Sequence, residues 1–450
     1  MSGSDLGADR AGARAGAREI VVATDHVPAV LASLEGMAVA TDADRRLGLT
    51  KVALLASGSE LERVFAAELE ERRLPGDSRA LRASDPVETV LAGLRVRYAT
   101  RYDGWFPVMG KNRDVVAGEG SPYMVIRSDD FPAPADAPTW VPGDGGRGIT
   151  VGLVDTPVLE QEAFGLQLEP VSTRLSAQPP WHYRTGHATF LAGLVAQHAP
   201  YARLVVRGVL DDDGARALAW DVAVGILDLV DAGADVVALP IGCFTEDGQP
   251  PLVLATAVAM ARDRALLVAA SGNHGSVDGA ATVHRTSPSW PAALDGVVAV
   301  GARGRDDALT PFTPQTPWLA LTAPGERLTS TFFRGPVRFD DAGEAPTMFD
   351  GFATWSGSSL SAAIAAGHLA STAAERLRFL GGSDLASRRL AVRLALRDVV
   401  RATDGVVRAA PGFLPSDPDS PADVSTPELP LTYRSDDRFE LALADVHADR

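Results

Sequence analysis

Apolar and polar positions follow two different patterns on either side of residue 149. Beyond that point short apolar runs, over 149–154, 202–210, 234–242, 265–271 and 296–302, alternate with helical segments over 188–199, 217–233 and 250–263. Continuous apolar strands that alternate with helices are typical of a parallel sheet that is buried on both faces. The pattern therefore predicts an α/β fold with a mostly parallel sheet, and further helices over 359–379 and 383–402.

The segment before residue 149 predicts a smaller α/β unit. Short buried strands are expected at 19–24 and 51–56, an amphipathic helix over 59–74 and an alternating strand over 94–102. A run rich in Pro, Gly and Asp over 128–146 marks a linker. The expected organisation is a disordered tail (1–17), an N-terminal α/β domain that is an accessory or prodomain-like unit (18–135), a linker (136–147), the main domain (148–405) and a Pro/Asp-rich C-terminal tail with at most one docked strand (406–450).

Composition and charge narrow the classes of function. At 450 residues the chain is long for a single core, which favours two domains plus tails. Its formal net charge of −16 argues against nucleic acids and anionic membranes as partners. No window approaches the roughly 18 apolar residues of a membrane span, and the N-terminus lacks the apolar core of a signal peptide. We therefore expect a cytoplasmic protein, whose single cysteine, Cys243, is a buried and unreactive thiol.

Four short motifs each carry one chemically capable side chain at the end of a strand or the start of a helix. Asp155 ends the run ITVGLV, and His187 opens the helical segment in TGHATFLAGL. Asn273 follows LLVAASG, and Ser359 lies in WSGSSLSAAIAAG. A carboxylate, an imidazole, an amide donor and a hydroxyl are the groups that acyl transfer through a serine requires. The order Asp, His, Ser is one of three in which this triad recurs on unrelated folds.

Each of these residues also has a purely structural interpretation. Asp155 could cap the turn that follows it, His187 could be a core histidine, and Asn273 could adopt a positive φ in its turn. Spacing alone does not choose the nucleophile, because any serine of the last motif could instead cap the helix. The candidates are Ser356, Ser358, Ser359 and Ser361. Only the joint occurrence of the four motifs in this order predicts a catalytic site.

At these residues the chain resembles the subtilisin-like serine proteases (subtilases, peptidase family S8), over roughly residues 148–402. The family's aspartate motif resembles VGLVDTPV, and its histidine motif, His-Gly-Thr-His-Val-Ala-Gly, aligns with HATFLAG. Its Ala-Gly-Asn-x-Gly turn aligns with SGNHG, and its serine motif aligns with GSSLSAAIAAG, which selects Ser359. SWPAALDGVVAVGA resembles the family's Tyr-Pro-Ala segment and makes Trp290–Pro291 a candidate cis bond. The resemblance implies a subtilisin-like three-layer fold.

The resemblance also implies a serine endopeptidase that hydrolyses protein or peptide substrates through an acyl-enzyme. Asp155, His187 and Ser359 would form its catalytic triad, and the Asn273 amide would contribute to the oxyanion hole. The substrate-binding residues would be Pro240, Ile241 and Gly242 on one segment and Ala270, Ser271 and Gly272 on another. His274, near the mouth of that pocket, is expected to be a solvated turn residue, and the alternative is a role in favouring acidic or polar substrate side chains. The chemistry requires no cofactor or metal, and structural calcium stays undecided.

Four departures from the family pattern keep an alternative open. Pro157 and Ala188 replace glycines close to the catalytic Asp and His, Phe190 replaces the second histidine, and Ala363 replaces the proline after the serine. The alternative is a catalytically weak or inactive protein that keeps the fold as a binding scaffold. A less favoured one is a triad that acts on a non-peptide acyl group.

The role of the N-terminal unit is open in the same way. It could be a prodomain that contacts the active site, cut from the chain between residues 130 and 148, or a permanent accessory domain. The aromatic and basic stretch over 102–115 could be a docking or inhibitory segment, or a surface loop that packs against the main domain.

Overall fold

A six-stranded sheet with the order β15-β14-β13-β11-β7-β9 forms the centre of the computed structural model. Its strands are β7 (Thr150–Asp155), β9 (Arg203–Gly208), β11 (Val236–Leu239), β13 (Leu266–Ala270), β14 (Val297–Arg303) and β15 (Leu319–Pro324). All neighbouring strands are parallel, as the apolar runs predicted. The structure describes residues 18–71, 85–117, 131–138, 145–161, 164, 167–211, 216–245, 248–276, 283–339 and 345–403.

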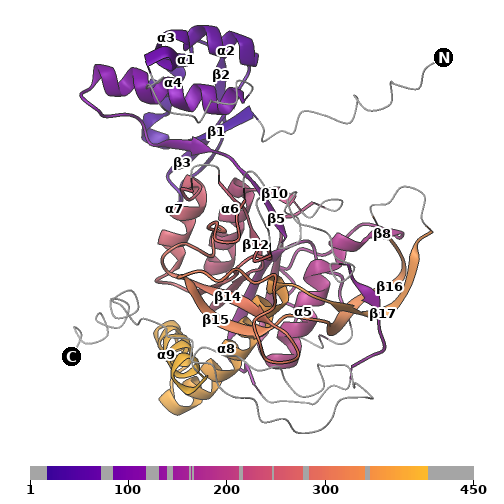
Figure 1. The fold of residues 1–450 in the computed structure, drawn as a ribbon. Helices are drawn as coiled ribbons and strands as arrows, with labels where there is room; N and C mark the ends of the chain where they lie inside the picture. Colours follow the sequence, from indigo (N-terminus) through magenta and orange to yellow (C-terminus); the bar gives the residue numbers. More distant parts are fainter. Residues whose placement is uncertain are drawn as a thin grey trace, which may run out of the picture.

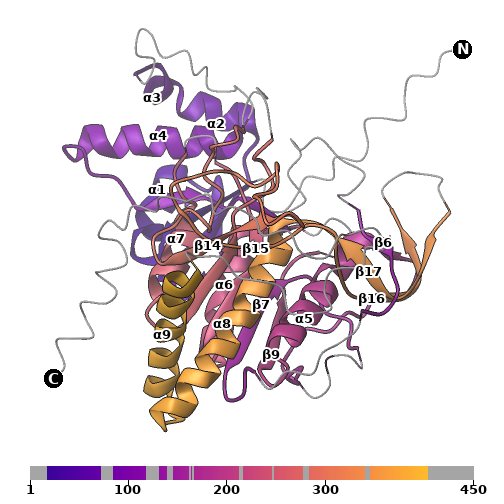
Figure 2. The same ribbon diagram turned by 60° about the horizontal axis from the view of Figure 1, so that its bottom comes forward.

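Helices cover both faces of this sheet (Figures 1 and 2). One face carries α6 (Ala219–Asp231) and α7 (Leu252–Ala261), and the other carries α5 (His187–His198) and α8 (Ser358–Leu380), with α9 (Leu385–Thr403) against α8. Successive side chains of a strand point to opposite faces of the sheet. In β7, Val151 and Leu153 belong to the apolar cluster of α5 and α8, whereas Val154 belongs to that of α6 and α7. The predicted three-layer α/β fold is confirmed.

Glycines let the helices on the α8 face approach their neighbours closely. A Cβ atom at Gly367 of α8 would lie 2.8 Å from the Cβ of His198 in α5. A Cβ atom at Gly193 of α5 would collide with the hydroxyls of Ser330 and Thr331. Any larger residue at these two positions would push α5 away from α8 or from the strand beneath it.

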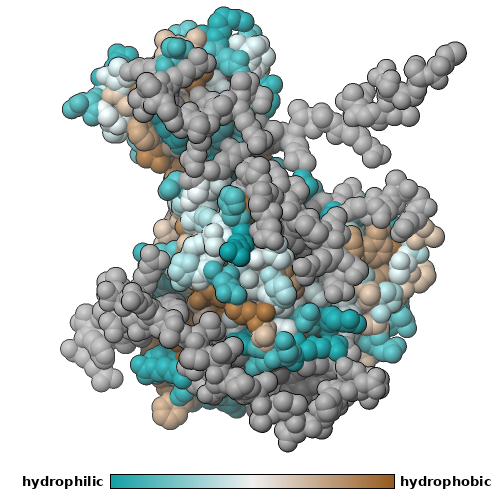
Figure 3. All heavy atoms as spheres, in the orientation of Figure 1, coloured by the Kyte–Doolittle hydropathy of each residue, from teal (hydrophilic) through white to brown (hydrophobic). Residues whose placement is uncertain are grey.

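A second sheet, with the order β6-β17-β16-β8, lies beside α5. Its strands are β6 (Ala133–Pro134), β8 (Trp181–His182), β16 (Leu328–Arg338) and β17 (Thr347–Trp355). Figure 3 shows hydrophobic residues gathered over this sheet, on the right of the view. The long β16–β17 hairpin was not predicted, because Gly335 and Pro336 interrupt the alternation of β16. Its second strand leads directly into α8.

The N-terminal segment forms an antiparallel sheet with the order β2-β3-β1-β4, at the top of Figure 1. The strands are β1 (Glu19–Ala23), β2 (Ala38–Asp44), β3 (Leu49–Leu54) and β4 (Met109–Lys111). The helices are η2 (Thr24–His26), α1 (Val27–Leu34), α2 (Gly58–Val64), α3 (Ala66–Glu71) and α4 (Pro86–Arg101). The strands predicted at 19–24 and 51–56 correspond to β1 and β3, and the helix expected over 59–74 is divided at Phe65, with 72–74 outside the described residues.

The strand expected over 94–102 is wrong, because that segment belongs to α4. Asp85 caps the helix by accepting a hydrogen bond from the Val87 N–H at 2.9 Å, and Pro86 occupies the first turn. The buried residues include Val87, Val90, Leu91, Leu94 and Tyr98, which recur at intervals of three and four. Helical burial over the whole segment therefore outweighs the local alternation.

One strand of the N-terminal segment pairs outside its own sheet. β5 (Asp114–Ala117) lies between β10 (Arg216–Leu218) and β12 (Ile241–Gly242) and is antiparallel to both. The expected tails over 1–17 and 406–450 fall outside the described residues. Within the described part of the chain, none of the helices has the length and apolarity that a bilayer crossing requires.

Candidate active site

The carboxyl edge of the six-stranded sheet gathers the four side chains that the sequence singled out. Asp155 is the last residue of β7, and Asn273 lies in the turn after β13. His187 opens α5, and Ser359 lies in the first turn of α8. Because parallel strands end at the same edge of a sheet, residues far apart in the sequence meet there.

Asp155, His187 and Ser359 form one continuous hydrogen-bonded line. The Asp155 Oδ2 lies 2.8 Å from His187 Nδ1, and His187 Nε2 lies 3.0 Å from Ser359 Oγ. The three residues are 0%, 1% and 0% exposed. An ionised carboxylate only accepts, so Nδ1 carries the proton and Nε2 is left as the acceptor for the serine hydroxyl. This tautomer is the one a general base requires.

Thr156, which the sequence did not single out, fixes the carboxylate and ties it to α5. Its backbone N–H donates to Asp155 Oδ1 at 2.7 Å, and its hydroxyl lies 3.2 Å from the same oxygen. The hydroxyl also accepts the N–H of Ala188 at 3.1 Å. The residue after the aspartate therefore links the end of β7 to the first turn of the helix that carries His187.

The neighbouring serines are each engaged elsewhere. Ser356 Oγ accepts the N–H of Arg327, and Ser358 Oγ accepts the N–H of Gly272. Ser361 Oγ donates to the carbonyl of Pro324. These contacts distinguish Ser359, whose Oγ is the one hydrogen-bonded to the imidazole.

Asn273 is oriented by a hydrogen bond from the serine segment. Its Oδ1 accepts the backbone N–H of Ser358 at 2.9 Å, so its amide nitrogen faces the other way. A Cβ atom at Gly357 would lie 3.3 Å from Ser359 Oγ and 3.5 Å from the Asn273 Nδ2. The amide nitrogen and the serine oxygen therefore lie on the same side of this glycine.

Comparison with known proteins places this arrangement in a family. The model of the subtilase family matches residues 146–401, more than half of the chain. The chain belongs to the subtilase family.

Individual relatives of this subtilase are distant. It is 33% identical to the thermophilic serine proteinase of Bacillus sp. (strain AK1), over 33% of this chain and 32% of that protein. It is 26% identical to the intracellular serine protease of Paenibacillus polymyxa, over 55% of this chain and 76% of that protein. Its fold resembles that of fervidolysin from Fervidobacterium pennivorans, a keratinolytic enzyme related to subtilisin, with a TM-score of 0.52 at 15% identity. That match covers 81% of this chain and 56% of fervidolysin. The chain thus spans about a third of the length of the first relative.

The four departures of this subtilase from the family motifs lie around the hydrogen-bonded line without interrupting it. Pro157 packs on Gly208, where a Cβ atom would lie 2.7 Å from the proline nitrogen. Phe190 lies edge-on to Trp355, with ring centroids 5.7 Å apart. Ala188 and Ala363 are fully buried within α5 and α8.

Of the predictions for two residues near the site, one is confirmed and one is wrong. Cys243 is buried as predicted, and burial raises the pKa of its thiol to about 12. The expectation for His274 is wrong, because this residue is 1% exposed rather than solvated. It packs edge-on against Phe244 with ring centroids 4.7 Å apart. The predicted cis peptide bond at Trp290–Pro291 is present.

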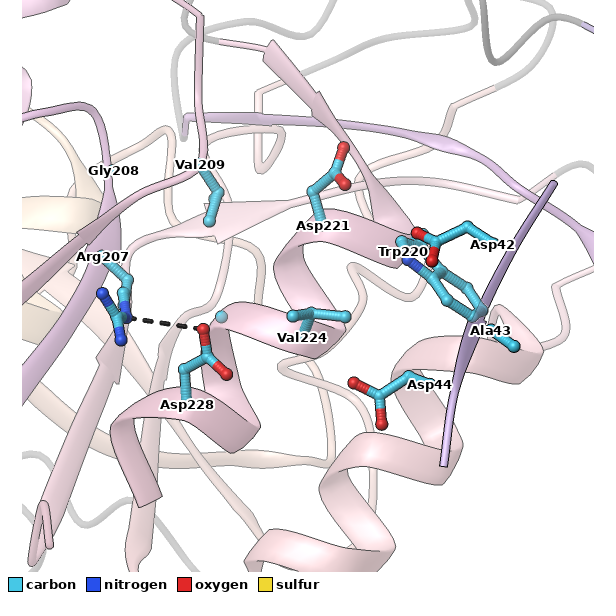
Figure 4. A pocket seen from close by; sticks show the side chains of 11 residues that line it. Asp42, Ala43, Asp44, Arg207, Gly208, Val209, Trp220, Asp221, Val224 and Asp228 are labelled. Carbon is cyan, nitrogen blue, oxygen red and sulfur yellow. Dashed lines mark ion pairs between the residues drawn. The ribbon is translucent and has the colours of Figure 1, made fainter. Parts of the chain in front are cut away.

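A pocket of about 520 Å³ lies away from these residues, between β2 and α6 (Figure 4). Its polar lining consists of Asp42, Asp44, Asp221, Asp228 and Arg207, with Trp220 in the wall. The Arg207 Nε lies 3.6 Å from Asp228 Oδ2, as the dashed line in Figure 4 marks. In the described part of the chain no group of three or more His, Cys, Asp or Glu residues is arranged to hold a metal ion.

Proposed function

We propose that this subtilase is a serine endopeptidase that hydrolyses protein or peptide substrates through Asp155, His187 and Ser359. The observation that carries the proposal is the line from Asp155 Oδ2 through His187 to Ser359 Oγ, with contacts of 2.8 Å and 3.0 Å. His187 Nε2 takes the Ser359 proton as Oγ attacks the scissile carbonyl, and Asp155 stabilises the imidazolium. His187 then protonates the leaving amine, and water hydrolyses the acyl-enzyme by the same proton transfers in reverse.

We propose that Asn273 stabilises the oxyanion. Because its Oδ1 accepts the Ser358 N–H, its amide nitrogen lies on the side of Ser359. The backbone N–H of Ser359, in the first turn of α8, would be the second donor. Both donors would strengthen their contacts as negative charge develops on the carbonyl oxygen.

We propose that β5 occupies the place of the substrate residues before the scissile bond. It is antiparallel to β12, with Ala117 opposite Ile241 and Val116 opposite Gly242. The C-terminal end of β5 therefore points back along β12 toward Leu239, at the carboxyl edge where Ser359 lies. An extended peptide that adds a strand between two edges is a common mode of peptide recognition. On this proposal Ile241, Gly242 and the segment Ala270–Gly272 form the substrate site.

The N-terminal unit would then be a prodomain-like inhibitor within the same chain. Val115 of β5 is fully buried in the same apolar cluster as α6 and α7. Arg46 Nη1, in the turn between β2 and β3, lies 2.9 Å from a carboxylate oxygen of both Asp228 and Asp231 on α6. Lys51 lies over the ring of Trp220, with Nζ 5.5 Å from its centroid. Since Ser359 has no exposed surface, substrate access requires part of the chain to move.

We propose a cytoplasmic location, with no nucleic acid or membrane partner. The net charge of −16 disfavours polyanionic partners, and a relative is named as an intracellular protease. Cell fractionation with an antibody against the chain tests the location. Recovery in the membrane pellet or the medium would overturn it.

An active-site fluorophosphonate probe tests the catalytic proposal. We expect the full-length chain to label slowly, the Ser359→Ala variant not to label, and the matched Ser358→Ala variant to retain labelling. Mass spectrometry of the wild type beside Ser359→Ala tests the role of β5. We expect a wild-type-only cut after Ala117 and before Phe131, upstream of the range that the linker composition suggested. A folded wild type that neither labels nor cleaves would instead support the scaffold alternative.

A further inference from the structure

Two glycines face each other across the proposed substrate site, and the space beside both is already partly filled. A Cβ atom at Gly242 of β12 would lie 2.7 Å from the Oγ of Ser289. A Cβ atom at Gly272 would lie 2.7 Å from His274 Nδ1 and 3.5 Å from the same Ser289 Oγ. Ser289 and His274 therefore close the gap between the two segments that would enclose a substrate side chain.

His274 presents a hydrogen-bond acceptor on that side. Its Nε2 lies 2.9 Å from the carbonyl oxygen of Ser287, so Nε2 carries the proton and donates. Burial lowers the pKa of the imidazole to about 4, which keeps the ring neutral and Nδ1 unprotonated at neutral pH. Within the described part of the chain Nδ1 is buried and has no hydrogen-bond partner. A buried acceptor of this kind favours a ligand that brings a donor.

Neighbouring contacts hold the ring in this position. Phe244 packs against it in an edge-to-face arrangement, with ring centroids 4.7 Å apart and planes at 83°. The segment that carries Ser289 is bound to the residue after β12 by two backbone hydrogen bonds of 2.9 Å between Cys243 and Trp290. The acceptor and the hydroxyl are thus fixed parts of the wall, and the imidazole cannot turn away at low cost.

We propose that His274 and Ser289 are specificity-determining residues for the substrate residue that supplies the scissile carbonyl. They select a short side chain that carries a hydrogen-bond donor: serine, threonine or asparagine. The inference rests on the proposed endopeptidase function and on its substrate segments. Ser289 leaves no depth for phenylalanine, leucine, lysine or arginine. An aspartate would bring a second acceptor against the Nδ1 lone pair, and an alanine would fit but leave Nδ1 without a donor.

The test uses purified wild type, incubated until its own cleavage has freed the substrate site from β5, and internally quenched peptides that differ only at this residue. We expect kcat/KM for the serine, threonine and asparagine peptides to exceed that for alanine by about 10- to 100-fold, since an unpaired buried acceptor costs that order. Leucine and lysine peptides should fall below alanine. A wild type that labels with fluorophosphonate but prefers leucine or lysine would overturn this inference and leave the proposed function intact. No labelling and no cleavage would overturn both.

Two variants separate the two residues. His274→Leu should lose the preference for serine over alanine, whatever its overall rate, and Ser289→Gly should gain at least tenfold on the leucine peptide. The matched control is Ser276→Gly, on the same loop but exposed, which should leave the profile unchanged. If His274→Leu does not fold, the Ser289→Gly profile decides. An unchanged leucine rate in folded Ser289→Gly would refute the proposal that Ser289 limits the depth of the substrate site.

Discussion

The attachment of β5 to the cleft makes a quantitative prediction for Val115→Ala. Val115 is 0% exposed and packs in the apolar cluster of α6 and α7, whereas Val116, on the other face of the strand, is only partly buried. Removal of two buried carbons costs about 0.8 kcal/mol each, and the residual cavity raises the total to about 2 kcal/mol. At 1.4 kcal/mol per factor of ten, docking of β5 should weaken about 30-fold.

Hydrogen exchange and probe labelling both report this docking. In the uncleavable Ser359→Ala background, the β5 amides that pair with β10 and β12 should exchange about 30-fold faster in Val115→Ala. In the active chain, Val115→Ala should label with fluorophosphonate correspondingly faster. Val116→Ala is the matched control and should change either rate less than about fivefold. Equal effects of the two substitutions, or exchange within twofold of the parent, would refute the reasoning.

Further predictions concern the triad, the oxyanion donor and two buried side chains. Asp155→Asn should lower kcat by about 10⁴ with an intact fold by circular dichroism, because the tautomer of His187 is lost. Asn273→Leu should lower kcat by about 10²–10³, a figure taken from subtilisin itself, with little change in KM. Burial lowers the pKa of His198 to about 4, so between pH 6.5 and 4 the unfolded chain binds a proton at this residue and the folded chain does not. Its contribution to the unfolding free energy is therefore present above pH 6.5 and falls by about 3 kcal/mol as the pH drops to 4, so urea titrations of His198→Gln should show a pH dependence that is smaller than that of the wild type by this amount. Cys243 should resist iodoacetamide in the native state and react only after unfolding, by mass spectrometry.

The parts of the fold that the sequence predicted are those decided by local burial. The run that ends at Asp155 is apolar at every position because β7 is covered on both faces, and that pattern is legible without the structure. The same holds for the helix that begins at His187. Both side chains could be assigned to the carboxyl edge of the sheet because a parallel sheet leaves no other position for them.

Long-range pairing was beyond the reach of the same reasoning. β5 consists of Asp114–Ala117, and its partners lie about one hundred residues further along the chain. Nothing in four residues indicates which edge they join. The predicted exposure of His274 was wrong for a similar reason. Its turn is polar in the sequence, whereas its burial depends on contact with Phe244. Thr156 was missed because its role rests on hydrogen bonds with Asp155, Thr185 and Ala188 rather than on a motif.

Two of the departures from the family motifs, Phe190 and Pro157, belong to coupled contacts, which explains how the triad geometry persists beside them. Phe190 packs on Trp355, and Trp355 in turn packs on His187 in an edge-to-face arrangement, with ring centroids 5.5 Å apart. Pro157 has its counterpart in Gly208, whose missing side chain makes room for the proline ring. Phe190 and Pro157 thus act through partners that the family motifs do not include. Reversion of one member alone would leave the other without its contact, so the altered neighbours by themselves do not imply a weaker enzyme.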